Sequence, residues 1–102
     1  MSITKPIISI YAEFQIFAVQ AIPGELSIHT DHISFKASGM IKDSELKDTF
    51  LFNEINQLQL QRGLLLHKLV IVDKENEVWH FTKINKTDAK HFINQYRNYT
   101  SK

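Results

Sequence analysis

Apolar and polar residues alternate along most of this chain, and that alternation constrains the fold more than any other feature. The longest example is segment 8–22, where the apolar residues at even positions up to Ala18 are separated by Ser9, Glu13 and Gln15. Successive side chains of a β-strand point to opposite faces, so this period predicts a half-buried strand, with a helix as the weaker alternative for its first half. Pro23-Gly24 follows and predicts a tight turn.

The same alternation continues in shorter segments, which predicts a series of hairpins. The expected elements are two short strands between Glu25 and Lys36 around Thr30-Asp31, a polar surface loop from Ala37 to Lys47, two strands on either side of Asn53-Glu54 with Gly63 ending the second, and a hairpin of Leu65–Val72 and Val78–Ile84 around the turn residues 73–76. β-branched and aromatic residues make the last hairpin the clearest of these.

The period changes near the C-terminus. Apolar residues at positions i, i+3, i+4 and i+7, with a capping residue before them, predict one amphipathic helix of about three turns; they are Ala89, Phe92, Ile93 and Tyr96, with Asn85 or Thr87 as N-cap. We therefore predict a mainly β fold of about seven antiparallel strands, capped by one C-terminal α-helix. At 102 residues the chain is expected to form a single domain, 1–102.

Composition limits the function. With 12 basic and 11 acidic residues and no basic cluster, no nucleic-acid partner is expected. The chain has no cysteine and three glycines, and it lacks a nucleophile elbow, a paired acid motif and a phosphate loop, so we expect no catalysis. Segment 6–22 contains Glu13, Gln15 and Gln20 and lacks a basic leader, so neither a signal peptide nor a membrane span is expected. The predicted location is cytoplasmic.

Three neighbouring side chains suggest a metal site. His29 and His32 flank Asp31, and imidazoles with a carboxylate are ligands that zinc or nickel accepts. A strand-turn segment rarely points two imidazoles at one ion, and a further ligand would have to come from elsewhere in the fold, where the candidates are His67, His80 and His91. We therefore predict no metal and no cofactor.

Several short strings occur in an order and spacing typical of one family. They are Gly24-Glu25-Leu26-Ser27-Ile28, Ile33-Ser34-Phe35, Phe52-Asn53-Glu54-Ile55-Asn56-Gln57-Leu58, Asn76-Glu77-Val78-Trp79-His80-Phe81-Thr82 and the helix start at Asp88-Ala89. Together they resemble a GRAM or bacterial PH-like domain of the pleckstrin-homology superfold, over about residues 14–99. The resemblance implies a PH-like barrel and a binding module for phosphoinositides, peptides or proteins, without catalytic residues of its own.

One departure from that pattern concerns lipid binding. The resemblance implies that phosphoinositides are held by basic residues on the loop between the first two strands, where several cations must converge on phosphate oxygens. Here that loop is predicted to be Pro23-Gly24, which offers no basic side chain. Phosphoinositide recognition by this route is therefore not expected.

Two surfaces remain as candidate binding sites. The first combines a neutral glutamine face with three consecutive leucines that cannot all point inward; its residues are Gln57, Gln59, Gln61, Leu64, Leu65 and Leu66. It predicts protein binding or self-association through a strand edge. The second is the loop with lysines around an apolar pair, comprising Lys36, Met40, Ile41, Lys42 and Lys47. It predicts an alternative function, peripheral binding to anionic lipid on the inner face of the membrane.

Overall fold

The computed structural model describes residues 5–17, 20–38 and 49–100, which form a mainly β fold with one C-terminal helix. The elements are β1 (Ile8–Phe17), β2 (Gln20–Ile28), β3 (His32–Ala37), β4 (Thr49–Leu51), the 3₁₀ turn η1 (Phe52–Glu54), β5 (Ile55–Gln61), β6 (Leu66–Asp73), β7 (Val78–Asn85) and α1 (Lys86–Thr100). The expected fold class, with seven antiparallel strands and a terminal helix, is confirmed.

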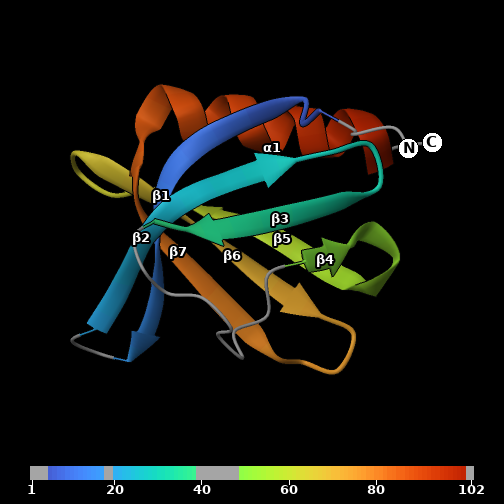
Figure 1. The fold of residues 1–102 in the computed structure, drawn as a ribbon, viewed down its shortest axis with the longest axis horizontal. Helices are drawn as coiled ribbons and strands as arrows, with labels where there is room; N and C mark the ends of the chain where they lie inside the picture. Colours follow the sequence, from blue (N-terminus) through green and yellow to red (C-terminus); the bar gives the residue numbers. More distant parts are fainter. Residues whose placement is uncertain (1–4, 18–19, 39–48, 101–102) are drawn as a thin grey trace.

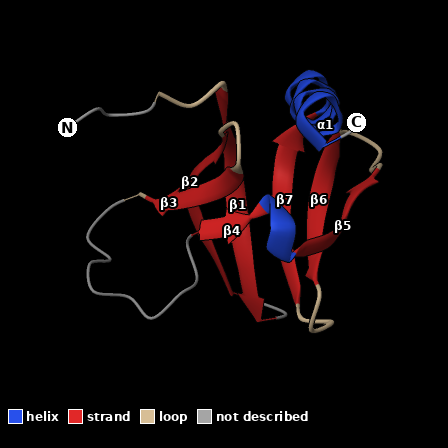
Figure 2. Ribbon diagram, turned by 90° about the vertical axis from the view of Figure 1, so that its right-hand side faces the viewer, coloured by secondary structure: helices blue, strands red, loops and turns tan. Residues whose placement is uncertain are grey.

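The seven strands form one antiparallel sheet in the order β4-β3-β2-β1-β7-β6-β5. The sheet curls into a half-barrel, so that β2, β3 and β4 face β5, β6 and β7 across the interior (Figures 1 and 2). β1 joins the two halves, because it pairs with β2 along its length and with β7 through Glu13, Phe14 and Gln15. The helix α1 lies across one end of the curl (Figure 2).

Pro23 and Gly24 lie inside β2, so the turn predicted there is wrong. Pro23 faces Glu13 and Gly24 faces Ala12 on β1. The Pro23 carbonyl accepts a hydrogen bond from Ser38 N at 2.9 Å, just past Gly24 and Ala37, the last pair of β2 and β3. Proline has no N–H to donate, and here that N–H is missing at the end of the β2–β3 pairing. The link between β1 and β2 is Ala18-Val19, outside the described residues and also without a basic side chain.

A second difference concerns Phe52, which was expected in a strand. Phe52 begins η1, and its N–H donates to the carbonyl of Asp31 at 2.9 Å instead of to a neighbouring strand. Its ring packs edge-on against Tyr96 of α1, with 5.2 Å between ring centroids. The two predicted strands are therefore the short β4 and the longer β5, separated by one 3₁₀ turn. Of the predicted 37–47 loop, residues 39–47 lie outside the described residues.

Aromatic rings from four strands meet in the core. Phe14, Phe35 and Phe81 pack with ring centroids 5.2–5.8 Å apart, and Phe50 meets Phe81 edge-on at 6.0 Å. Aliphatic residues of β1, β2, β3, β6 and β7 surround these rings. The amphipathic face of α1 closes the core, with Ala89, Phe92 and Ile93 buried.

The start of α1 is fixed by a side chain that the sequence identified. Asn85 Oδ1 accepts the backbone N–H of Thr87 at 2.8 Å and that of Asp88 at 3.3 Å. These are two of the donors that a helix start leaves unpaired, so Asn85 is the N-cap. Within the part of the chain that the structure describes, no helix is long and apolar enough to cross a bilayer.

Candidate functional site

The strand β5 is one of the two edges of the sheet, because among the described residues it pairs only with β6. The opposite edge, β4, is three residues long, whereas β5 has seven. An edge strand presents backbone N–H and C=O groups that can pair with another chain. No charged side chain lies between Ile55 and Gln61 to discourage that pairing.

The three glutamines of β5 lie in a row on one face of the strand. Gln59 Nε2 donates to Gln57 Oε1 at 3.1 Å, and Gln61 Nε2 donates to Gln59 Oε1 at 3.5 Å. Gln57 and Gln61 are exposed and Gln59 is half-buried. Each amide has more donors and acceptors than these contacts use, so the row can also bond to a partner.

A groove separates β5 from the helix. It is shallow and open to solvent, with a volume of about 640 Å³, and it is lined by residues 57–62 together with Ile93 and Arg97 of α1. Leu58 and Leu60 are half-buried and pack against the core, so they give the groove an apolar wall. Its charged lining residues are Arg62 and Arg97, both basic.

The leucines predicted to share the glutamine surface lie beyond the groove. The leucine turn, residues 63–66, joins β5 to β6, and Leu64, Leu65 and Leu66 are 99%, 83% and 47% exposed. At least one was expected on the surface, and all three are there. The structure thus brings Gln57, Gln59 and Gln61 together with α1, and it places the leucines at the end of the hairpin.

Two residues hold the leucine turn in place. A Cβ on Gly63 would lie 2.1 Å from the carbonyl oxygen of Leu66, so only glycine fits this close approach. The Gly63 N–H donates to Nδ1 of His67 at 3.4 Å, and the His67 side chain is 5% exposed. The buried imidazole therefore anchors the start of the turn, while the leucines point outward.

Of the second predicted surface, only Lys36 lies among the described residues; Met40, Ile41, Lys42 and Lys47 lie outside them. Lys36 is exposed on β3, directly across from Glu25 on β2. Its positive charge therefore sits beside a carboxylate, which weakens its attraction for an anionic surface.

The candidate histidine ligands stack instead of converging. The rings of His29 and His32 are 4.1 Å apart and inclined by 10°, so their lone pairs lie in two nearly parallel planes. His32 Nδ1 lies 2.7 Å from Asp31 Oδ1. Burial, followed by the neighbouring His32 charge, lowers the pKa of His29, with Asp31 acting in the opposite direction. This geometry does not hold one ion between the two rings.

An acidic cluster that sequence reasoning missed lies at the β6–β7 turn. The carboxylates of Asp73, Glu75 and Glu77 lie within 4.8 Å of one another. Asp73 Oδ1 accepts the backbone N–H of Glu75 and that of Glu77, each at 2.9 Å. The alternation Asp-x-Glu-x-Glu was the available signal, and the hydrogen bonds give Asp73 the role of fixing the turn.

No protein-family model matches the sequence, and no curated protein does. No sequence pattern indicated that α1 would form one side of the groove. Ile93 was expected as a core residue and Arg97 was not singled out, because their relation to β5 depends on how α1 packs.

Proposed function

We propose that this chain is a GRAM- or PH-like binding module without catalytic activity, which binds an extended segment of a partner protein along β5. The observation that carries the proposal is a seven-residue edge strand without charged side chains beside a groove with an apolar wall. In strand addition, backbone hydrogen bonds provide affinity and the alternating side chains provide specificity. The fold supports the proposal, since the helix and the strand edge form the two sides of one groove.

The lining of the groove indicates what the partner segment carries. One set of the partner's alternating side chains would face Leu58 and Leu60, which are half-buried, and this favours apolar residues there. Arg62 and Arg97 favour carboxylates on the segment, because both of the charged lining residues are basic. A second copy of β5 contains no carboxylate between Ile55 and Gln61, so a different protein fits better than self-association.

A library of random linear peptides displayed on phage is the probe for this proposal. We expect selected peptides to carry acidic residues and to slow amide hydrogen exchange in β5 without slowing it in β4. Slower exchange in β5 that depends on protein concentration, without peptide, would instead indicate self-association. Peptides that protect only β4 or the outer face of α1 would contradict the proposal.

Charge removal tests the same contact from the side of the protein. The double variant Arg62→Gln and Arg97→Gln is expected to weaken peptide binding about tenfold, since each exposed ion pair contributes up to about 1 kcal/mol. Binding should also lose most of its salt dependence. Lys90→Gln is the matched control, because Lys90 is exposed on the same helix and does not line the groove. An equal loss of binding in both would rule out specific recognition by the groove arginines.

A further inference from the structure

We propose that the leucine turn docks this protein on an anionic membrane surface, inserting Leu64 and Leu65 among the lipids. This inference goes beyond the proposed protein binding and concerns the leucine turn, whose surroundings share Gln61 and Arg62 with the groove. The turn between β5 and β6 projects at one end of the molecule (Figure 1). Leu64 and Leu65 are 99% and 83% exposed, so they contribute almost nothing to the core. The transfer of exposed apolar side chains from water into a bilayer lowers the free energy.

The leucine turn is built to keep that exposure. Gly63 allows the Leu66 carbonyl to approach to a distance that any other residue would obstruct. The buried His67 accepts the Gly63 N–H and so fixes the base of the turn. These contacts already order the turn. Insertion into a membrane therefore costs less conformational entropy than it would for a flexible loop.

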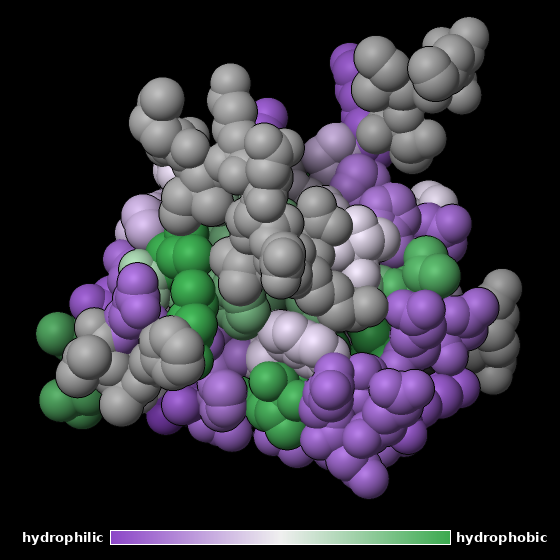
Figure 3. All heavy atoms as spheres, turned by 60° about the horizontal axis from the view of Figure 1, so that its bottom comes forward, coloured by the Kyte–Doolittle hydropathy of each residue, from purple (hydrophilic) through white to green (hydrophobic). Residues whose placement is uncertain are grey.

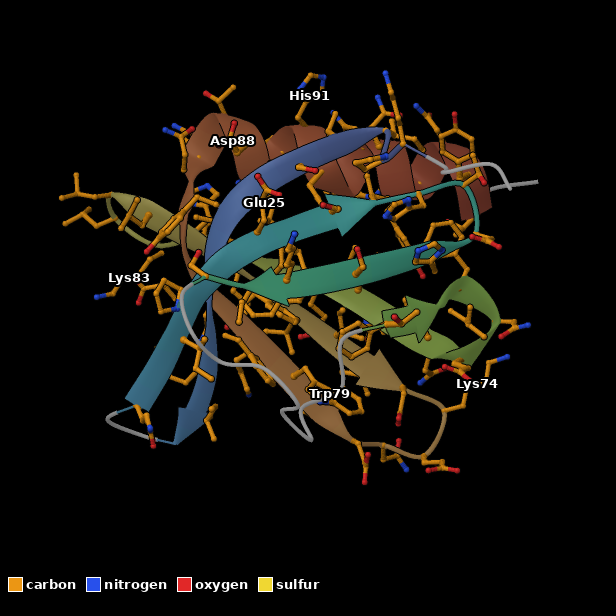
Figure 4. All side chains as sticks on the ribbon, in the orientation of Figure 1. Glu25, Lys74, Trp79, Lys83, Asp88 and His91 are labelled. Atoms are coloured by element: carbon orange, nitrogen blue, oxygen red, sulfur yellow. The ribbon has the colours of Figure 1, made fainter. Side chains whose placement is uncertain are left out.

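Basic side chains surround the base of the leucine turn. A hollow of about 230 Å³ beneath it is lined by Arg62, Lys68 and Lys83, and none of its described lining residues is acidic. Lys83 extends beside the turn from β7 (Figure 4). With Lys86, four of the twelve basic residues of the chain fall in the segments 61–68 and 82–86, which contain no acidic residue. Cations placed around an apolar projection match the phosphates and carboxylates of an anionic bilayer.

The opposite end of β6 carries the opposite charge. The strand β6 runs from the leucine turn to the acidic cluster of Asp73, Glu75 and Glu77. In a view with this end turned forward, hydrophilic side chains gather at the lower right, and hydrophobic ones project at the left edge (Figure 3). This charge separation orients the leucine turn toward an anionic surface and the acidic cluster away from it.

A bilayer fits this surface better than a second copy of the chain. Two leucine turns in contact would bring Arg62, Lys68 and Lys83 of both copies together, and like charges repel. The turn is also convex, so a protein partner would have to provide a matching pocket, whereas a fluid bilayer adapts to the projection. A soluble acidic protein is therefore the alternative occupant that the experiment must separate.

Co-sedimentation with vesicles tests the proposal. The purified protein is mixed with neutral phosphatidylcholine vesicles, or with vesicles that also contain phosphatidylglycerol, at low and at physiological salt. We expect pelleting with the anionic vesicles and its reduction by salt. Leu64→Gln with Leu65→Gln should lower the partition coefficient at least about tenfold, because each substitution removes the favourable free energy of transferring a leucine side chain from water to lipid. Val78→Gln is the matched control, because Val78 is 47% exposed at the acidic end.

A second set of variants separates this surface from the lysine loop. Arg62→Gln with Lys68→Gln should reduce binding to anionic vesicles, whereas Lys36→Gln with Lys42→Gln and Lys47→Gln should leave it unchanged. The proposal is overturned if wild-type protein stays in the supernatant with anionic vesicles at low salt. It is equally overturned if the leucine variant pellets like wild type, or if only the loop variant loses binding.

A fluorescent label reports insertion directly. The chain has no cysteine, so Leu64→Cys provides a single attachment site for an environment-sensitive dye. With anionic vesicles we expect a blue shift and quenching by brominated lipids, whereas a dye on Val78→Cys should show neither. An unshifted dye at position 64 on protein that pellets would place the membrane contact elsewhere and overturn the proposal.

Discussion

At the scale of single residues, the need for glycine at position 24 follows from the close approach of β2 and β3. A Cβ at this position would lie 2.4 Å from the Lys36 carbonyl oxygen and 2.7 Å from Cζ of Phe35. The backbone of β3 cannot move aside without disturbing the sheet, and Phe35 is part of the core. The glycine is therefore required by packing and not by a turn.

Replacing Gly24 with alanine should consequently destabilise the fold. We expect Gly24→Ala to lower the free energy of unfolding by about 1–3 kcal/mol, the usual effect of overpacking. Urea denaturation measures the change. Gln20→Ala, at an exposed position of the same strand, is the control and should stay within about 0.5 kcal/mol of wild type. If Gly24→Ala were as stable as the control, the close approach would be wrong.

The histidine stack predicts a pH dependence at the same scale. Burial and the His32 charge lower the pKa of His29 in the folded protein, so folding favours the neutral ring. Stability from His29 is therefore complete above the usual value of about 6.5 and is lost as pH falls below it. Asp31, whose pKa is lowered chiefly by its hydrogen bond with His32, stabilises the fold above its usual pKa of about 3.8, and this contribution is lost only at lower pH, below the range in which His29 titrates.

Denaturation measured at several pH values tests this dependence. His29→Gln should remove part of the loss of stability between neutral pH and about pH 5. His91→Gln, exposed on α1, removes a histidine without disturbing the stack and should not. The same slope in wild type and His29→Gln would show that the stack is not responsible.

At the scale of elements, α1 depends on its first residues. Asn85→Ala removes the acceptor of the Thr87 and Asp88 N–H groups, and we expect it to cost about 1 kcal/mol. Thermal or urea unfolding followed by circular dichroism measures this. Thr87→Ala distinguishes the two caps that the sequence allowed, and it should change stability by only a few tenths of a kcal/mol. A larger effect of Thr87→Ala would assign the cap to Thr87.

The elements could largely be predicted from periodicity, because a half-buried strand and an amphipathic helix leave different spacings. The β6–β7 hairpin and α1 lie close to the predicted residues. The predictions were wrong at Pro23-Gly24 and Phe52, where contacts with distant residues determine the local secondary structure. Proline followed by glycine is typical of a turn, and local sequence cannot show that Phe35 and Lys36 lie against Gly24.

At the scale of the whole molecule, the candidate sites could be predicted only in part. The glutamine row and the leucines were visible as unusual stretches, and the structure separates them into the face of an edge strand and the turn after it. The groove requires α1 beside β5, and the basic surround requires Lys83 of β7 beside Arg62. These are neighbours in space and not in sequence, so no local pattern identifies them.

The pairing of β1 with β7 also determines when the domain can be completed during synthesis. Residues 13–15 of β1 pair with residues 80–82 of β7, which are synthesised much later. Most of the chain must therefore leave the ribosome before the half-barrel can close. At roughly 5–20 residues per second, translation leaves the inner edge of β1 without its partner for several seconds. In that interval β1 is an additional open strand, available to a chaperone or to a neighbouring nascent chain, and it is no longer open in the finished protein.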